Sequence, residues 1–115
     1  TLKDLADKVK ETFKLSGLRV VGDMNKKIKR IGILGGSGGS IPCLNDALRE
    51  KLDCYITGEI HLDKAIYANQ RGLCLLEVNH GVERFVFEGL ITELKDKFGD
   101  RFVISDINTD PLISY

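Results

Sequence analysis

Residues 33–48 of the chain read ILGGSGGSIPCLNDAL. Two apolar residues lead into four glycines and one serine within five positions, and Pro42 then stands in the first turn of a helical pattern. Proline is tolerated there because its missing N–H leaves no hydrogen bond unmade. Clustered glycine costs entropy on folding, so either the backbone turns sharply here or another group comes close to it. The stretch predicts a strand, a tight loop and a helix in succession.

Helical and strand patterns alternate on both sides of this loop. Leu2, Leu5, Val9 and Phe13 recur at three- and four-residue steps, which predicts an opening helix, and Gly17 is expected to end it. Strands are predicted at 18–21 and 28–34, as possible neighbours, and at 54–57, 73–78 and 101–105. Helices are predicted at 42–52, 60–70 and 83–98. The last helix has an expected core-facing stripe of Val86, Leu90, Leu94 and Phe98.

The alternation of strands and helices with short connections predicts the fold class. Parallel strands need a crossover between them, so we expect an α/β fold with a mostly parallel or mixed sheet covered by helices. The 115 residues are enough for one domain with a real core. Because the chain opens at Thr1 without an initiator Met, we expect residues 1–115 to be one α/β domain from a longer protein.

Composition excludes several classes of partner. The 17 Lys and Arg balance the 17 Asp and Glu, so no overall positive field would attract nucleic acid or an anionic membrane. No apolar run approaches the roughly 20 residues of a membrane helix, and we expect a cytoplasmic protein. Cys43, Cys54 and Cys74 are odd in number and lack C-x-x-C spacing, which predicts reduced core thiols.

Polar side chains follow the predicted strands where each strand ends. In parallel sheets, ligands gather outside the carboxyl ends of the strands, so we expect these residues to share one edge. They are Ser37 and Ser40 after the first strand of the series, Thr57, Glu59 and His61 after the second, His80 and Glu83 after the third, and Asp106 and Asp110 after the last.

The glycine loop matches neither common nucleotide motif. No lysine lies between Arg30 and Lys51, which excludes a Walker A loop, and Ile41 stands where the dinucleotide pattern requires its last glycine. Two interpretations remain. Free backbone N–H groups ahead of a helix can cradle an oxyanion, or the glycines allow close packing of strand and helix.

His80 and His61 are the two histidines of the chain. Neutral imidazole and carboxylate suit Zn, Mn or Fe(II), so His80 and Glu83 are candidate metal ligands, although they supply only part of a coordination shell. The alternative for His80 is a helix-entry residue beside a carboxylate favoured by the helix dipole. For His61 the alternative is a solvated or helix-capping role.

Three stretches together resemble a known family. ILGGSGGS at 33–40, YITGEI at 55–60 and EVNHGVE at 77–83, in this order and spacing, resemble the C-terminal half of the Nif-three-like family, also named GTP cyclohydrolase 1 type 2 homologues. The opening helix and the LRVVGD stretch at 18–23 fit as well, so the similarity covers nearly the whole chain. The resemblance implies an α/β domain, a dinuclear divalent-metal site and a toroidal homohexamer.

Particular residues correspond to the family's site. The late metal motif of the family is a His followed by a Glu, which matches His80 and Glu83, although the family usually has three intervening residues and this chain has two. Asp63 stands where the family often has a His, with His61 two positions earlier. The paired histidines and a further aspartate of the family belong to an N-terminal half that these residues do not include.

The resemblance implies a divalent-metal-dependent hydrolase of a nucleotide or another phosphorylated small molecule, with two ions (Zn, Mn or Fe) per subunit of the full-length protein. In this hypothesis His80 and Glu83 bind metal and Glu83 also takes part in catalysis. The alternatives are a ligand-binding module whose loop holds an anion, and a non-catalytic module for oligomerisation or protein interaction. Substrate contacts are expected from Gly36, Ser37, Gly38, Glu59 and His61.

Overall fold

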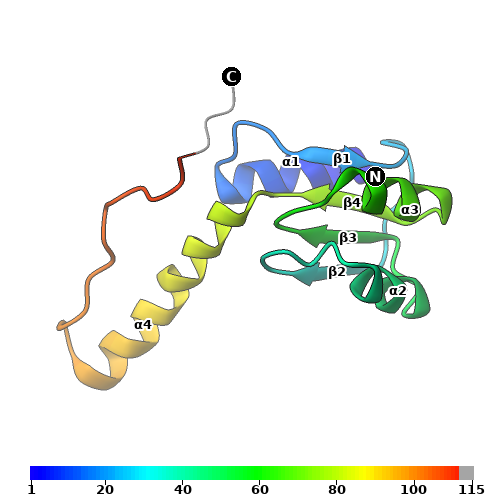
Figure 1. Ribbon diagram of the computed structural model, residues 1–115. Helices are drawn as coiled ribbons and strands as arrows, with labels where there is room; N and C mark the ends of the chain where they lie inside the picture. The colour runs from blue at the N-terminus through cyan, green and yellow to red at the C-terminus, as the bar shows by residue number, and fades with distance from the viewer. Residues whose placement is uncertain (112–115) are drawn as a thin grey trace.

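A four-stranded sheet separates two layers of helices in the computed structural model, which describes residues 1–111 (Figure 1). The strand order is β1-β4-β3-β2. Three strands run parallel, with Ile31 beside Cys54 and Cys54 beside Cys74, while the first strand is antiparallel to its neighbour. The predicted α/β class with a mixed sheet is confirmed. The strands are β1 (Arg19–Val21), β2 (Ile31–Leu34), β3 (Cys54–Thr57) and β4 (Cys74–Glu77).

The two central strands are covered on both faces. Successive side chains of a strand point to opposite faces, so β3 and β4 contribute to two separate cores. Cys54, Ile56, Cys74 and Leu76 pack with the first helix, whereas Tyr55, Leu73 and Leu75 pack with the second and third helices. This explains why both strands read as continuous apolar runs in the sequence.

The helix α1 (Leu2–Phe13) covers one face of the sheet. Thr1 begins it through a capping box, in which the Thr1 hydroxyl accepts a hydrogen bond from the Asp4 N–H at 3.3 Å. The helix ends at Lys14, whose φ of 52° is left-handed, and not at Gly17 as predicted. A left-handed residue closes a helix because it redirects the chain out of the helical path.

The helices α2 (Ile41–Arg49) and α3 (Leu62–Gln70) form the crossovers between the parallel strands. Both exist as predicted, but α2 ends earlier than 52 and α3 begins later than 60. The glycine loop lies between β2 and α2, and Ser40 is the N-cap of α2. This arrangement confirms the strand, loop and helix predicted for residues 33–48.

Two predictions about the first strands are wrong. The strand predicted at 28–34 begins only at Ile31, because the N–H groups of Lys29 and Arg30 both donate to Asp53 Oδ2 at 2.8 Å and not to a neighbouring strand. The strands β1 and β2 are not neighbours either. They lie at opposite edges of the sheet, since β4 and β3 separate them.

The end of the described chain differs most from expectation. A 3-10 helix, His80–Phe85, leads into α4 (Val86–Phe98), which projects away from the sheet (Figure 1). The predicted core-facing stripe is wrong, because α4 has no buried residue. The strand predicted at 101–105 does not form; in residues 1–111 this segment finds no strand to pair with, and a strand needs a hydrogen-bonded partner.

The three cysteines are free, as predicted. Cys54 and Cys74 are buried, while Cys43 is only half-buried and packs at the border of the second core. Burial raises the pKa of the Cys54 thiol to about 12, so this thiol stays protonated and unreactive near neutral pH. Among residues 1–111 no helix is both long and apolar enough to span a bilayer.

Candidate functional site

Three loops meet at the carboxyl edge of the parallel strands. They are the glycine loop after β2, the Thr57–His61 turn after β3 and the Asn79–Glu83 segment after β4. In-register parallel pairing places the ends of these strands side by side, with Leu34 beside Thr57 and Thr57 beside Glu77. The predicted gathering at one sheet edge is therefore confirmed for the first three of the four groups.

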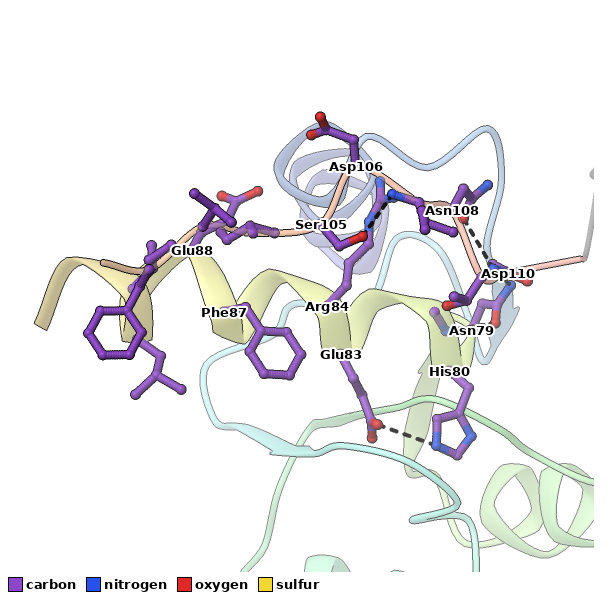
Figure 2. A pocket seen from close by; sticks show the side chains of 18 of the residues that line it. Asn79, His80, Glu83, Arg84, Phe87, Glu88, Ser105, Asp106, Asn108 and Asp110 are labelled. Atoms are coloured by element: carbon purple, nitrogen blue, oxygen red, sulfur yellow. Dashed lines mark hydrogen bonds and ion pairs between the residues drawn. The ribbon is translucent and has the colours of Figure 1, made fainter. Parts of the chain in front are cut away.

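His80 and Glu83 form an ion pair at this edge. The His80 Nε2 atom lies 3.4 Å from Glu83 Oε2, and both side chains are about half exposed. Figure 2 shows the imidazole and the carboxylate on the same side of the 3-10 helix, pointing toward one another. A turn of 3-10 helix repeats every three residues, so the spacing of three brings both side chains to one side.

Glu59 joins the other two loops. Its Oε1 atom lies 3.0 Å from His80 Nδ1, and its Oε2 atom accepts a hydrogen bond of 2.8 Å from the Ser37 hydroxyl. One carboxylate thus connects the glycine loop with the histidine, across separations of 22 and 21 residues in the sequence. The sequence predicted a substrate contact for Ser37 and not this contact with Glu59.

The charges of this cluster shift its pKa values in opposite directions. The hydrogen bond from Ser37, followed by the one to His80, lowers the pKa of Glu59 below its ordinary range. The hydrogen bond to Glu59, followed by the charge of Glu83, raises the pKa of His80 above 6.5. Both shifts favour the charged forms, as expected for an imidazole between two carboxylates.

Glycine is needed at two positions of the loop for different reasons. Gly36 has a left-handed φ of 66°, and a Cβ atom there would lie 3.2 Å from Glu83 Oε1 and 3.5 Å from His80 Nε2. A Cβ atom at Gly38 would instead lie 2.5 Å from Thr57 Oγ1. Gly36 therefore leaves room beside the His80 and Glu83 pair, whereas Gly38 is buried and allows the loop to pack on β3. Both early interpretations of the glycine cluster, a sharp turn and a close approach, apply.

Side chains of β3 and β4 hold these loops in place. The Tyr55 hydroxyl donates to the Gly38 carbonyl and the Thr57 hydroxyl donates to the Gly36 carbonyl, both at 3.1 Å. The Glu77 carboxylate, which is only 15% exposed, accepts from the Ile60 N–H at 3.1 Å and pairs with Arg19. None of these three roles is predicted by the sequence, because a hydroxyl or carboxylate within an apolar strand does not reveal which loop it will contact.

A groove of about 1070 Å³ opens from this edge between α4 and residues 102–111. His80, Glu83 and Glu59 line one end of it, and apolar side chains of α4 line the other. Asn79, with a left-handed φ of 69°, donates from Nδ2 to Asp110 Oδ2 at 3.2 Å and so ties the returning segment to the end of β4 (Figure 2). Asp110 therefore reaches the site, but from an extended segment and not from a strand.

Two predicted residues lie apart from the cluster. His61 is the exposed N-cap of α3, and its side chain makes no capping hydrogen bond. Asp106 is exposed on the wall of the groove. The structure brings together Gly36, Ser37, Glu59, His80 and Glu83.

The cluster supplies only part of the ligand set that a divalent ion needs. In the described part of the chain, no group of three or more His, Cys, Asp or Glu side chains is arranged to hold a metal ion. His80 Nε2 and Glu83 Oε2 nevertheless fit part of such a site. Their separation of 3.4 Å is shorter than the sum of two bonds of about 2.1 Å, so one ion can contact both. Further ligands would have to come from outside the described residues.

Known proteins resemble this chain over nearly its whole length. A "GTP cyclohydrolase 1 type 2 homolog" of Staphylococcus aureus (strain MSSA476) is 38% identical over 116 residues, covering 96% of this chain and 31% of that protein. The protein of the same name from Bacillus subtilis (strain 168) is 32% identical with the same coverage. The chain thus spans about a third of the length of these relatives.

Solved structures show the same fold. A Bacillus cereus protein related to NIF3 superposes with a TM-score of 0.88 at 31% identity, covering 100% of this chain and 33% of that one. A hypothetical protein of Staphylococcus aureus superposes with a TM-score of 0.87 at 38% identity, covering 34% of its chain. The sequence model of one family, Duf34/NIF3, matches residues 1–111. The chain therefore belongs to the Duf34/NIF3 family (NGG1p interacting factor 3).

Proposed function

We propose that this chain supplies His80 and Glu83 to a divalent-metal site in a longer hydrolase whose substrate is a nucleotide or a related phosphorylated molecule. The observation that carries the proposal is the approach of His80 Nε2 to Glu83 Oε2 at 3.4 Å beside Gly36, which has no side chain and so leaves space for a ligand. A bound divalent ion would lower the pKa of a coordinated water and so supply a nucleophile at neutral pH.

The surrounding charges support a cation at this position. Two carboxylates, Glu59 and Glu83, flank a single imidazole, so the cluster attracts a positive ion. The same carboxylates would repel a phosphate placed directly on the glycine loop. A metal ion between them would remove that repulsion, which favours the metal-dependent hydrolase over a loop that holds an anion alone. The name of the similar Staphylococcus aureus protein, GTP cyclohydrolase 1 type 2 homolog, agrees with a nucleotide substrate.

The remaining ligands are expected outside this chain. Two protein ligands do not hold a catalytic ion firmly, since catalytic zinc sites use three. We therefore propose that the isolated 115-residue chain binds divalent metal weakly, and that the longer protein binds two ions per subunit. The identity of the ions, Zn, Mn or Fe, depends on the missing ligands.

Metal content and thermal stability of a His80→Ala variant test the proposal. In the longer protein this change should remove at least one ion per subunit and most hydrolytic activity, while the melting temperature of the metal-free protein stays within a few degrees of wild type. His61→Ala is the matched control, because His61 lies outside the cluster, and it should retain both ions. Retained metal together with lost stability in His80→Ala would show that His80 is a structural helix-entry residue.

A second candidate function is an assembly module. The observation that favours it is the exposure of α4. Its Val86 (65% exposed), Leu90 (44%) and Phe98 (58%) are apolar, and none of its residues is buried. Exposed apolar surface of this kind is typical of interfaces. We propose a homohexamer as the assembly, in agreement with the family resemblance. Ring formation measured by solution mass, without metal binding or turnover, would favour this function over the hydrolase.

A further inference from the structure

Four side chains from three loops form one continuous chain of polar contacts at the sheet edge. Ser37 donates to Glu59, Glu59 contacts His80 Nδ1, and His80 Nε2 faces Glu83, with separations of 2.8, 3.0 and 3.4 Å. The order of these contacts limits the proton transfers that the four side chains can make. Ser37 contacts the carboxylate and not the imidazole, so in this arrangement the Ser37 hydroxyl does not donate its proton to His80.

The contacts determine which nitrogen of His80 carries its proton. A glutamate carboxylate is ionised near neutral pH, and an ionised carboxylate can only accept hydrogen bonds. One oxygen accepts from Ser37, so the other must accept from an Nδ1–H of His80. In the neutral imidazole the Nε2 atom then holds a lone pair, and this atom is the one that faces Glu83.

The backbone that follows Glu59 is held through both polar groups of Ile60. The next residue, Ile60, donates its N–H to the Glu77 carboxylate and accepts a hydrogen bond from Arg19 at 3.0 Å through its carbonyl. Arg19 and Glu77 also pair with each other across β1 and β4. The carboxylate of Glu59 therefore projects from a fixed backbone, and Ser37 restrains its far oxygen.

We propose that Glu59 is a positioning residue for His80, which holds the proton on Nδ1 and aims the free Nε2 atom at the space beside Glu83. The inference rests on the proposed metal site, and it replaces the substrate contact that the sequence suggested for Glu59. Both carboxylate oxygens already have donors, so Glu59 acts on a ligand through His80. Carboxylates that hold a ligating histidine in this way raise the affinity of the histidine for metal.

The experiment combines two measurements on the longer protein. Nitrogen NMR of histidine-labelled protein, freed of metal and held above the pKa of His80, shows which ring nitrogen carries the proton. The His80 signals are assigned by their absence from His80→Gln. Zinc alone is then titrated into wild type, Glu59→Ala, Glu59→Gln and Ser37→Ala. The signals of His61, whose exposed side chain makes no hydrogen bond within residues 1–111, provide the control in each spectrum.

Wild type is expected to carry the His80 proton on Nδ1. Glu59→Ala should move the proton to Nε2 and weaken zinc binding by about 10- to 100-fold. Glu59→Gln keeps an oxygen that can accept from Nδ1–H and should recover part of both properties, and Ser37→Ala should weaken zinc binding less than Glu59→Ala.

Two results would overturn the positioning role: a wild-type His80 protonated on Nε2, or a Glu59→Ala variant whose proton position and zinc affinity are both unchanged. Failure of the proposed function gives a different result. If wild type binds no zinc but Glu59→Ala still moves the proton, Glu59 orients His80 and the metal site is wrong. If zinc binds equally to wild type and Glu59→Ala and the proton stays on Nδ1 in both, the metal site stands and Glu59 does not position His80.

Discussion

The helices α1 and α4 have nearly equal lengths, 12 and 13 residues, and both carry apolar residues at helical spacing. Only α1 buries them, with Leu2, Ala6 and Val9 packed against β3 and β4. The helix α4 leaves the sheet and buries no residue (Figure 1). An apolar stripe therefore predicts that a helix has a face to bury, but not that the covering surface lies within the same stretch of chain.

The two helices also differ in their relation to the site. The sheet that α1 covers holds the glycine loop and Glu59 on rigid strand ends. The segment that leads into α4 carries His80 and Glu83 on a 3-10 helix whose residues are all at least partly exposed. The candidate site thus lies at the border between a packed unit and a projecting one.

The largest expected effect is on the free energy of unfolding of the 115-residue chain, when one leucine of α1 and one of α4 are each truncated. Leu2→Ala should lower the free energy of unfolding by about 2–5 kcal/mol, because Leu2 is fully buried and its truncation leaves a cavity. Leu90→Ala should lower it by less than about 1 kcal/mol, since Leu90 is 44% exposed. Denaturant unfolding followed by circular dichroism measures both.

Equal losses in the two leucine variants would contradict the comparison, because they would mean that α4 is packed as tightly as α1. The same two leucine variants in the longer protein test whether α4 is covered there. A larger loss for Leu90→Ala there than in the 115-residue chain would identify α4 as a face that the remainder of the protein covers.

A smaller difference in stability is expected between alanine variants of Gly38, in the buried loop after β2, and Gly17, in the exposed connection between α1 and β1. In Gly38→Ala the new methyl group would lie 2.5 Å from Thr57 Oγ1 and 2.8 Å from the Tyr55 hydroxyl oxygen, so we expect a loss of about 1–3 kcal/mol. Gly17→Ala is the matched control, because a Cβ atom there meets nothing within 4 Å. Melting temperatures of the two variants check this. A Gly38→Ala variant as stable as Gly17→Ala would show that the loop moves away from β3 without cost.

The smallest effect concerns charge. The Asp53 carboxylate accepts the N–H groups of Arg30 and Lys29, which lowers its pKa below 3.8. A lowered carboxyl pKa stabilises the fold above about pH 4, and this contribution disappears as the pH falls through the folded pKa. Asp53→Asn should therefore melt below wild type at pH 6, with the difference shrinking toward pH 2.

Asp100→Asn is the control for the charge effect, because Asp100 is 94% exposed beside α4 and pairs with Lys95 only at 3.7 Å. We expect no measurable change in its melting temperature at either pH. A decrease equal to that of Asp53→Asn would mean that the two carboxylates contribute alike, contrary to the difference between the packed and projecting units.

Local patterns in the sequence determined much of this protein. The period of the apolar residues predicted α1 and α4, Pro42 in a helical first turn predicted α2, and the run at Cys54–Thr57 predicted a buried strand, as observed. The spacing of His80 and Glu83, together with their place after a buried strand, indicated the candidate ligands. These features follow from the sequence because each depends on residues only a few positions apart.

Tertiary structure alone decided which distant segments meet. Placing β1 against β4, leaving α4 uncovered and leaving residues 101–105 unpaired all depend on which partner surfaces are present. The contacts of Glu59 with Ser37 and His80 join residues 22 and 21 positions apart, and no local pattern encodes them. A side chain's type and period define what it can bind or bury, whereas the chain's path through space defines the neighbour that it finds.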